Sequence, residues 1–470
     1  MVDFRMESDS IGEKGVPSTA YYGVQSLRGN ENFHISGELL HKKMIQALAI
    51  IKKACAISNY KAKVLSKDIM EAISEACDEV AEGEFDHEFI VDPIQGGAGT
   101  TANMNANEVI ANRANEIMGG TLGKYEYIHP NDHVNMGQST NDVYPTAGKL
   151  GALFLLPRLL KELNLLHEAF LEKSEEFSDT LKMGRTQLQD AVPIRLGQEF
   201  HAYASVIKRD IDRIENAANA LKRINMGASA VGTGINVDTY YFNIIAHVIS
   251  ELSGIELHQA EDLVDGTHNL DGLVEVSSSL KTVAINLSKI CNDLRLMSSG
   301  PLTMVGDINL PPRQNGSSIM PGKVNPVIPE VVSQVAFRVI GNDLTITMAA
   351  EGGQLELNAF EPIIFYSLYQ SIEFLEHAVN TLRINCVKGI TANTEKLLDD
   401  VHKSTGVITA LVPHIGYSHA ARIAKKSLET GIPVRKIIEE ENLLTKEQLD
   451  EILDPFDMTS PGIAAKHLLK

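Results

Sequence analysis

Residues 316–326 carry the side chains of this sequence that are best suited to chemistry. The stretch reads Gly-Ser-Ser-Ile-Met-Pro-Gly-Lys-Val-Asn-Pro, so hydroxyl, ammonium and amide groups lie close together between glycines and prolines. A helix that begins at the final proline would have Asn325 as its cap and would direct the positive end of its dipole at the loop. With the Lys323 ammonium, that helix end favours a carboxylate or phosphate beside Ser317 and Ser318. An ordinary Gly/Ser/Pro linker is the alternative interpretation.

Three further polar stretches interrupt the chain. Residues 92–101 read Asp-Pro-Ile-Gln-Gly-Gly-Ala-Gly-Thr-Thr, which would let Thr100 approach a ligand closely or would only cap the next helix. A phosphate-binding loop is excluded there, because neither Gly-x-x-x-x-Gly-Lys nor a preceding β-rich run is present. Residues 131–142 are dense in amides and hydroxyls, which can donate to a carboxylate without adding charge or can bond their own backbone. Residues 183–191 are the last interruption.

Long helices with narrow apolar seams must position these stretches. Their apolar residues are spaced alternately by three and four, which is typical of helices packed against near-parallel neighbours. A first long helix is predicted over about residues 142–176, with a kink at Pro157. The seam residues assigned to the core are Leu273, Val276, Leu280, Val283, Leu287, Ile290, Leu294 and Met297, then Ile207, Ile211, Ile214, Ala218 and Leu221, and then Leu368, Ile372, Leu375, Val379 and Leu382.

The sequence predicts an all-α fold, because strand patterns with hairpin signals are nearly missing. Helices of some 30 residues would be about 45 Å long and would form a central bundle. We expect a mostly helical N-terminal domain at 1–140, the long-helix bundle at 141–394 and a small helical domain at 395–470. In the last of these, Thr445 and Gln448 predict a capping box. The segment up to about residue 35 is predicted to be irregular.

The composition argues against several classes of protein. The 470 residues are 44% hydrophobic, which is typical of a globular chain with a large core. The formal net charge of -19 opposes binding to nucleic acid and anionic membranes, and no apolar run approaches the ~20 residues that span a bilayer. Four dispersed cysteines favour buried reduced thiols over disulfides or a zinc site. We therefore expect a cytoplasmic protein without a metal centre.

Taken together, the four polar stretches resemble the fumarase and aspartase superfamily. Its signature, Gly-Ser-Ser-x-Met-Pro-x-Lys-x-Asn-Pro, is matched at every fixed position of residues 316–326. The similarity begins at Tyr-Tyr-Gly-Val-Gln, residues 21–25, and extends to the C-terminal helices. It implies a three-domain fold whose long helices form a shared core in a homotetramer, with active sites built from three subunits. It also implies anti elimination from a succinyl skeleton to fumarate, without an organic cofactor.

The resemblance assigns roles to the residues at matching positions. Ser317 would be the catalytic base that removes a proton from the carbon next to a carboxylate. Lys323 and Asn325 would hold that carboxylate as it becomes a dianionic aci-carboxylate. A serine alkoxide needs positive charge and N–H donors nearby, which the lysine and a helix start could supply. The other substrate-binding positions are Thr100, Ser139, Thr140 and Ser318 for the second carboxylate, and Asn141, Thr186 and Gln187 for the leaving group.

Gln187 helps to indicate which group leaves the substrate. In fumarases this position is usually a histidine that pairs with a glutamate matching Glu330, and the position of Thr140 is usually serine. Water needs an acid to leave as a neutral molecule, whereas an ammonium already carries its proton, and Gln187 cannot titrate. These residues and the run 325–330 resemble aspartases and predict deamination of L-aspartate to fumarate. The alternatives are a hydratase that interconverts L-malate and fumarate, and a structural homologue that has lost the reaction.

The sequence departs from the family pattern just before the signature loop. After Ser-Gly-Pro the family usually has Arg, Gly and Glu, whereas this chain has Leu302, Met304 and Asp307. The absence of the family's arginine could change the position of the signature loop or a contact between subunits. The matched catalytic positions are intact.

Overall fold

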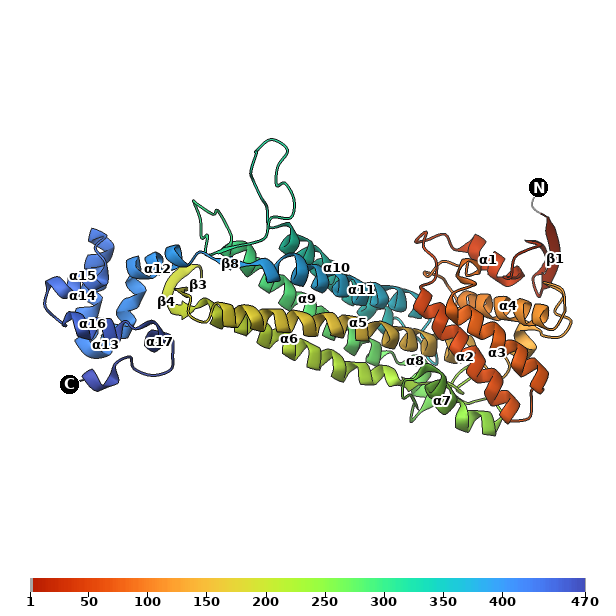
Figure 1. Ribbon diagram of the computed structural model, residues 1–470. Coiled ribbons are helices and arrows are strands. Elements are labelled where there is room, and N and C mark those ends of the chain that lie inside the picture. The colour runs from red at the N-terminus through yellow and green to blue at the C-terminus, as the bar shows by residue number, and fades with distance from the viewer. Residues whose placement is uncertain (1–2, 470) are drawn as a thin grey trace. The chain divides into compact units, whose positions relative to one another are not determined.

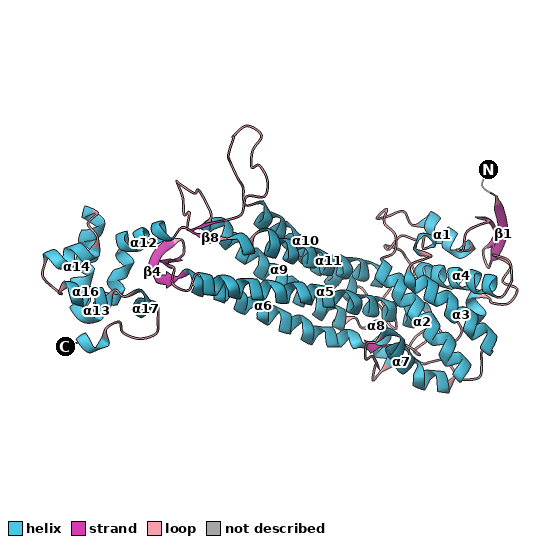
Figure 2. Cartoon of the chain, viewed as in Figure 1, coloured by secondary structure: helices cyan, strands magenta, loops and turns pink. Residues whose placement is uncertain are grey.

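The computed structural model describes residues 3–469, and helices dominate them (Figure 1, Figure 2). The expected all-α architecture is confirmed, because the strands occur only in two-stranded pairs. Among residues 3–469, no helix combines the length and the apolar character needed to cross a membrane. The bundle helices are α5 (Thr140–Glu176), α6 (Leu196–Ala218), α9 (Asp271–Met297), α10 (Val327–Glu351) and α11 (Glu361–Asn385).

The chain forms two compact units, each assembled from separated segments. The first unit consists of the described part of Met1–Lys161, Asp210–Ala284 and Val335–Glu376. The second unit consists of Glu162–Arg209, Ile285–Gln334 and the described part of His377–Lys470. The division of the chain at residues 140 and 394 stays a prediction.

The first unit combines its bundle segments with shorter elements. The helices are α1 (Val24–Asn32), α2 (Lys42–Lys61), α3 (Lys67–Glu82), α4 (Thr100–Ile117), α7 (Thr239–Ser253) and α8 (Leu263–His268). The strands are β1 (Phe4–Asp9) with β2 (Gly12–Pro17), and β5 (Arg223–Ile224) with β6 (His258–Gln259).

The prediction of irregular structure up to residue 35 is wrong. β1 and β2 pair in antiparallel fashion, and α1 follows them. Asp9 closes the hairpin, because its Oδ1 accepts the N–H groups of Ile11 and Gly12, and Gly12 adopts a φ of +142°. The apolar side chains of β1 face outward while its Glu7 is buried, which is the reverse of the usual strand pattern. That inversion hid the hairpin from sequence analysis.

The predicted helical seams form much of the core. Every seam residue of α9, from Leu273 to Met297, is buried, and so is every seam residue of α11, from Leu368 to Leu382. On α6 the buried residue is Ala217, whereas the predicted Ala218 is only partly buried. The cysteines Cys55, Cys77, Cys291 and Cys386 are all free and buried, which confirms the expected thiols.

The second unit includes the C-terminal helices. These are α12 (Thr394–Lys403), α13 (Ile408–Ile415), α14 (Tyr417–Thr430), α15 (Val434–Glu440), α16 (Lys446–Ile452) and α17 (Pro455–Met458). Its strands are β3 (Leu181–Thr186) with β4 (Gln189–Arg195), and β7 (Ile308–Asn309) with β8 (Thr391–Ala392). The capping box of Thr445 and Gln448 is confirmed at α16. Side chains of β3 share one apolar core with these helices.

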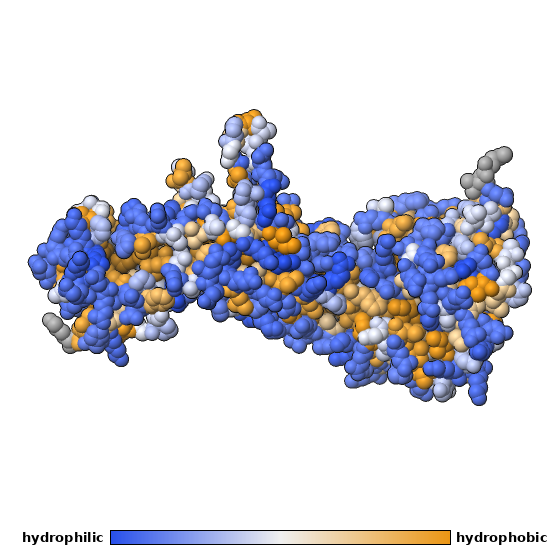
Figure 3. All heavy atoms as spheres, in the orientation of Figure 1, coloured by the Kyte–Doolittle hydropathy of each residue, from blue (hydrophilic) through white to orange (hydrophobic). Residues whose placement is uncertain are grey.

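An exposed row of apolar side chains lies on α10. The surface in view is mostly hydrophilic with apolar groups among it (Figure 3). On α10, however, Phe337, Ile340, Leu344 and Met348 are 65%, 38%, 64% and 62% exposed. Their spacing of three and four places them on one helix face. These four residues are called the α10 row below.

Candidate active site

The signature loop, residues 316–326, places backbone donors around Ser317. The Ser317 Oγ accepts the N–H groups of Ile319 at 3.2 Å and of Met320 at 3.1 Å. Two N–H donors on one hydroxyl oxygen would stabilise that oxygen after loss of its proton, which is the environment that a serine base needs. The loop itself therefore provides donors that the sequence analysis expected from a helix start.

Gly316 and Asn325 close the base of the signature loop. The Gly316 N–H donates to the Lys323 carbonyl oxygen at 2.7 Å, and Asn325 Nδ2 donates to the Gly316 carbonyl oxygen at 2.9 Å. A Cβ at Gly316 would come within 2.6 Å of the Lys323 carbonyl oxygen, so glycine is required there. Ser317, Ser318 and Lys323 are thus held in one closed turn.

The helix predicted to start near Pro326 is present. α10 begins at Val327, whose N–H donates to the Asn325 carbonyl oxygen at 2.9 Å. The bond that the Asn325 side chain forms is not the predicted cap, because its Nδ2 donates to the Gly316 carbonyl oxygen across the base of the loop. The helix nevertheless follows the loop directly (Figure 2).

The Lys323 ammonium is open to a ligand. Its side chain is exposed and forms no ion pair with any of residues 3–469. Two of the departures from the family pattern, Leu302 and Met304, are 95% and 62% exposed. They therefore contribute little to the core of the second unit.

Thr186 and Gln187 lie at the tip of the β3–β4 hairpin, which the sequence predicts only as a polar interruption. β3 ends at Thr186, and Gln187 and Leu188 form the connecting turn with φ values of 53° and 62°. Such turns usually contain Asn-Gly, so Gln-Leu gives no hairpin signal. Both predicted site residues are exposed. Positive φ at residues other than glycine is uncommon and concentrates at functional sites.

Asp307 anchors this hairpin from the interior of the second unit. Its side chain is fully buried, and its Oδ2 lies 3.0 Å from Lys182 Nζ and 2.8 Å from Arg185 Nη1, both on β3. Lys182 Nζ also lies 3.0 Å from Glu199 Oε2. The Asp307 departure is therefore a buried anion that holds the strand ending in Thr186. These partners could not be predicted from the sequence, because they are distant along the chain.

Thr100 is the first residue of α4, in the first unit. The three residues before it, Gly97, Ala98 and Gly99, have φ values of +85°, +55° and +91°. The exposed Thr100 Oγ1 donates to the Gly97 carbonyl oxygen at 2.7 Å. A Cβ at Gly99 would lie 2.3 Å from the Tyr144 ring, so the loop rests against α5. The turn precedes α4 directly and leaves the Thr100 hydroxyl exposed, and the role of Thr100 toward a ligand stays a prediction.

Ser139, Thr140 and Asn141 form the N-terminal turn of α5. The Ser139 Oγ accepts the Asn141 N–H at 3.2 Å, and Asp142 Oδ1 accepts the Ser139 N–H at 2.9 Å. The Ser139 hydroxyl hydrogen is consequently available to a ligand. Asn141 Nδ2 donates to the Ala230 carbonyl oxygen at 2.7 Å, which leaves Asn141 Oδ1 as an acceptor.

A buried polar network supports this turn, and sequence analysis missed it. Lys52 is 0% exposed, and its Nζ donates to Asn135 Oδ1 and to Gln138 Oε1, each at 2.9 Å. Asn103 Nδ2 lies 3.2 Å from both Asn135 Oδ1 and Thr140 Oγ1. Because Asn103 donates to Thr140, the Thr140 hydroxyl hydrogen remains to be donated elsewhere, such as to a carboxylate.

Burial shifts both charges near this network toward their neutral forms. It lowers the pKa of Lys52 to about 8, although Asp142 opposes the shift. It raises the pKa of Asp142 to about 6, against backbone N–H groups that stabilise the carboxylate. Lys52 lies four residues after Leu48 and three before Cys55, on the buried face of α2. That spacing could have marked it as a buried lysine.

The predicted site residues fall into three groups. In the first unit, Asn103 is one turn beyond Thr100 and contacts Thr140, so the starts of α4 and α5 adjoin. In the second unit, Thr186 and Gln187 share the hairpin tip. The remaining residues of the second unit, Ser317, Ser318, Lys323 and Asn325, share the signature loop.

Two family models match this chain. One, described as Lyase, matches residues 12–341, and the other, described as Fumarase C C-terminus, matches residues 407–460. The crystal structure of fumarate lyase:delta crystallin from Brucella melitensis bound to cobalt is 48% identical, with a TM-score of 0.96 over 98% of this chain and 100% of that one. Recombinant class II fumarase from Schistosoma mansoni is 35% identical, with a TM-score of 0.94 over the same shares. The predicted superfamily fold is therefore confirmed.

Relatives that align with nearly the whole chain identify the family more closely. An aspartate ammonia-lyase of Bacillus sp is 54% identical over 464 residues, which are 99% of each chain. That of Bacillus subtilis (strain 168) is 53% identical over 468 residues, 100% of this chain and 98% of the relative. That of Helicobacter pylori (strain 26695) is 49% identical over 98% of this chain and 99% of the relative. The chain therefore belongs to the aspartate ammonia-lyase family, within the fumarase/aspartase superfamily.

Proposed function

We propose that this carbon-nitrogen lyase catalyses the reversible deamination of L-aspartate to fumarate and ammonia, by anti elimination through an aci-carboxylate intermediate. Relatives named aspartate ammonia-lyase, at 54% and 53% identity over nearly the whole chain, support the substrate. The single structural observation that carries the residue assignment is the pair of N–H donors on the Ser317 Oγ.

Ser317 is the proposed base. It takes a proton from the carbon that bears the β-carboxylate, and the electron pair of that C–H bond moves onto the carboxylate oxygens. The alkoxide that accepts the proton is stabilised by the N–H groups of Ile319 and Met320. The electron pair then forms the carbon-carbon double bond as the C–N bond breaks, and nitrogen leaves as ammonia.

Lys323 and Asn325 are the proposed partners of the carboxylate that becomes a dianion. The exposed Lys323 ammonium forms no ion pair with the described residues, so a substrate anion would be its counter-ion. Asn325 Nδ2 uses one N–H group on the Gly316 carbonyl oxygen and retains the other for the substrate. The loss of one such donor typically slows a reaction by on the order of 100 to 1000-fold.

The second carboxylate is assigned to hydroxyl groups. The hydrogens of Ser139 and Thr140 are not engaged by the neighbours that donate to their oxygens. Ser318 is exposed in the signature loop. Thr100 donates to the Gly97 carbonyl oxygen and would turn away from it to donate to the substrate. These hydroxyls hold an anion without adding charge.

The leaving group is assigned to neutral acceptors. Asn141 Oδ1 remains an acceptor beside the α5 start, and Thr186 and Gln187 are exposed at the hairpin tip. An ammonium needs acceptors rather than an acid, because it departs as neutral ammonia. Elimination of water would be favoured by a titratable group near the leaving oxygen, and Gln187 cannot titrate. The hydratase is therefore the second candidate.

A homotetramer with shared active sites is the proposed assembly. The family resemblance implies that three copies contribute to each site, and the assigned residues are divided between the two units. The α10 row is the kind of apolar surface that a second copy would cover. The division into 1–140, 141–394 and 395–470 is the proposed domain organisation. Buried free cysteines support a reducing compartment, for which we propose the cytoplasm.

The ultraviolet absorbance of fumarate tests the reaction. The purified protein should produce it from L-aspartate and not from L-malate. Ser317→Ala should lower turnover by roughly 100 to 10,000-fold, because a general base is lost. Ser66→Ala is the matched control, since Ser66 is exposed and its side chain caps nothing.

Each other outcome has a distinct meaning. Product from L-malate alone would identify a fumarate hydratase. Absence of product from both substrates would identify a structural homologue. Unchanged turnover in Ser317→Ala, with the protein folded, would place the base elsewhere.

A further inference from the structure

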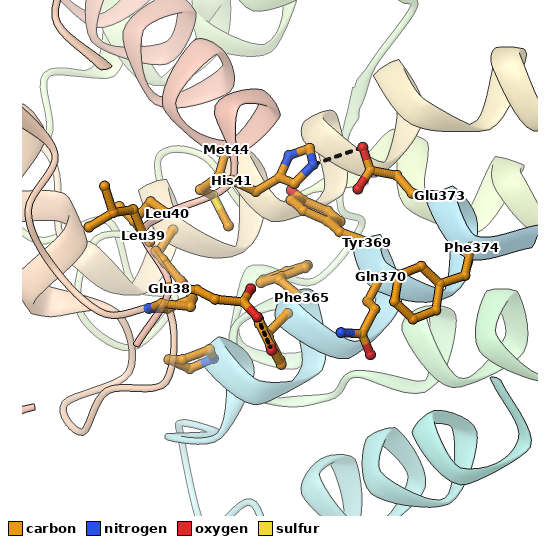
Figure 4. A pocket seen from close by; sticks show the side chains of 14 residues that line it. Glu38, Leu39, Leu40, His41, Met44, Phe365, Tyr369, Gln370, Glu373 and Phe374 are labelled. Carbon is orange, nitrogen blue, oxygen red and sulfur yellow. Dashed lines mark hydrogen bonds and ion pairs between the residues drawn. The ribbon is translucent and has the colours of Figure 1, made fainter. Parts of the chain in front are cut away.

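A cavity of about 210 Å³ lies in the first unit, apart from every residue assigned to the reaction. It is bounded by the chain that enters α2, from Glu38 to Met44, and by the N-terminal half of α11 (Figure 4). All residues that line it belong to the first unit. Its size suits a small organic molecule rather than a chain segment.

Aromatic rings form much of the wall. The Tyr144 and Phe365 rings meet edge to face with centroids 5.8 Å apart, and the Phe365 and Tyr369 centroids are 6.2 Å apart. Phe365 and Tyr369 are 1% and 3% exposed, so they are fixed in the core. The negative faces of such rings attract cations.

Among residues 3–469, the carboxylates that line the cavity are Glu38 and Glu373. Figure 4 shows them on opposite sides of Phe365 and Tyr369. Glu38 Oε1 accepts the Tyr366 hydroxyl at 3.1 Å. Glu373 Oε1 lies 3.1 Å from His41 Nε2. The described part of the chain contributes no lysine or arginine to the lining.

Both ring nitrogens of His41 are engaged by neighbouring groups. Its Nδ1 accepts the Lys43 N–H at 3.0 Å, so the ring hydrogen is on Nε2 and points at Glu373. The Lys43 ammonium is directed to Gln46 Oε1 at 2.9 Å. Outside the lining, Arg338 Nε donates to Gln370 Oε1 at 2.9 Å. The cavity lining therefore combines an apolar aromatic wall with the two carboxylates Glu38 and Glu373.

We propose that this cavity binds a small organic monocation, a protonated amine on a compact aromatic or apolar body. The ammonium would lie between Glu38 and Glu373, and the apolar body would lie on the aromatic wall. L-aspartate does not fit this description, because it carries a net negative charge and lacks an apolar body. The cavity is thus distinct from the proposed substrate site.

The wall of the cavity also adjoins the proposed substrate site. Tyr144 lines the cavity, and its ring is the surface on which Gly99 rests, next to Thr100. An occupant that displaces the Tyr144 ring would therefore move the start of α4. This second step rests on the proposed role of Thr100, whereas the binding of the amine does not.

Calorimetric titration of the intact protein tests the binding. The probes are 2-phenylethylammonium, 2-phenylethanol and 3-phenylpropionate, which are similar in size and differ in charge. We expect saturable binding of the ammonium, at least tenfold weaker binding of the alcohol and no binding of the anion. Equal binding of ammonium and alcohol, or no saturable binding of the ammonium, would overturn the proposal.

Variants localise the site. Glu373→Gln and Glu38→Gln should each weaken ammonium binding about tenfold, because one charge is removed, which corresponds to ~1.4 kcal/mol. Glu71→Gln is the matched control, since Glu71 pairs with Lys67 on the surface of α3. Leu39→Trp should block the cavity from its exposed side without disturbing the core. Unaltered binding in the two glutamate variants and in Leu39→Trp would refute this location.

Kinetics test the coupling separately. The ammonium probe should change the KM for L-aspartate in the native protein and should not change it in Leu39→Trp. An unchanged KM in the native protein would refute the coupling through Tyr144. The titration requires no turnover, so a failure of the proposed reaction cannot be mistaken for a failure of amine binding.

Discussion

The ionisation of Ser317 and of Lys52 depends on the groups around each side chain and not only on the residue type. The Ser317 oxygen accepts two backbone N–H groups, which favour its ionised form. Lys52 is an ordinary lysine whose burial lowers its pKa to about 8. It supports Thr140 through Asn135 and Asn103, without contact between Lys52 and Thr140. If Lys52 positions Thr140 in this way, its loss should change the KM for L-aspartate and the pH dependence of that KM.

Lys52→Met should raise the KM for L-aspartate about tenfold, because a charged hydrogen bond to a supporting group typically contributes ~1.5 kcal/mol or more. In the native protein, the same KM should rise as the pH passes above about 8, since Lys52 then loses its proton. The variant should lack that rise. Lys53→Met is the control, because Lys53 pairs with the exposed Asp78. A KM that rises equally above pH 8 in Lys52→Met would exclude Lys52 as its cause.

Above pH 8, the contribution of Lys52 to the free energy of unfolding should rise, whereas the affinity for L-aspartate should fall. Its pKa in the folded state is below the ordinary value of 10.5, so the buried charge lowers stability most fully below pH 8. Between pH 8 and 10.5 the unfolded chain holds this proton more tightly, and the contribution of Lys52 to stability rises. The loss of affinity above pH 8 is therefore not a sign of unfolding.

At the scale of single elements, the β3–β4 hairpin shows how a distant residue sets the place of a site residue. Gln187 lies in an exposed turn with positive φ, whereas the strand before it is fixed by Lys182 and Arg185. Both of these side chains meet the buried Asp307. The hairpin tip can therefore be exposed and still have a fixed position.

Asp307→Asn should lower the free energy of unfolding by about 3 kcal/mol, because the loss of the buried anion leaves the charges of Lys182 and Arg185 less compensated. Lys182 retains Glu199, which limits the loss. Asp399→Asn is the control, since its pair with Lys403 is exposed and typically contributes ~0 to 1 kcal/mol. Thermal unfolding followed by circular dichroism provides the comparison. Equal melting temperatures in the two variants would show that Asp307 is not an anchor.

At the scale of the whole molecule, one chain contains two units that share the assigned residues between them. The α10 row exposes apolar side chains that a monomer would leave in water. A second copy that covers this row would account for their exposure in the single chain. The proposed tetramer therefore depends on a surface that can be altered without touching the assigned residues.

Leu344→Asp should break the assembly, because a charge in the middle of the α10 row would lose its hydration on association. Light scattering should give four copies of the 51.3 kDa chain for the native protein and a smaller mass for the variant. The variant of smaller mass should also lose turnover. Leu428→Asp is the control, since Leu428 on α14 is 74% exposed outside the row. A monomeric native protein that turns over L-aspartate would contradict the shared site.

Local rules foresaw features whose cause is local. The seam of α9 follows from apolar spacing, and the capping box at Thr445 follows from side chains three residues apart. The same rules missed the β1–β2 hairpin, whose apolar residues face outward, and the Gln187 turn, which lacks the usual glycine. They also assigned Asn325 to a helix cap, whereas its side-chain amide donates to the Gly316 carbonyl oxygen across the loop.

The sequence by itself determined the helical bundle and the chemistry that the chain carries. Periodicity specifies which helix faces are buried, and the signature at residues 316–326 matches a family by residue type and order. The tertiary structure alone decided the surroundings of these groups: the donors on Ser317, the buried Lys52 network and the Asp307 anchor. The physical reason is that hydrogen bonding and desolvation depend on which distant residues meet, whereas helix faces depend on neighbours three and four residues apart.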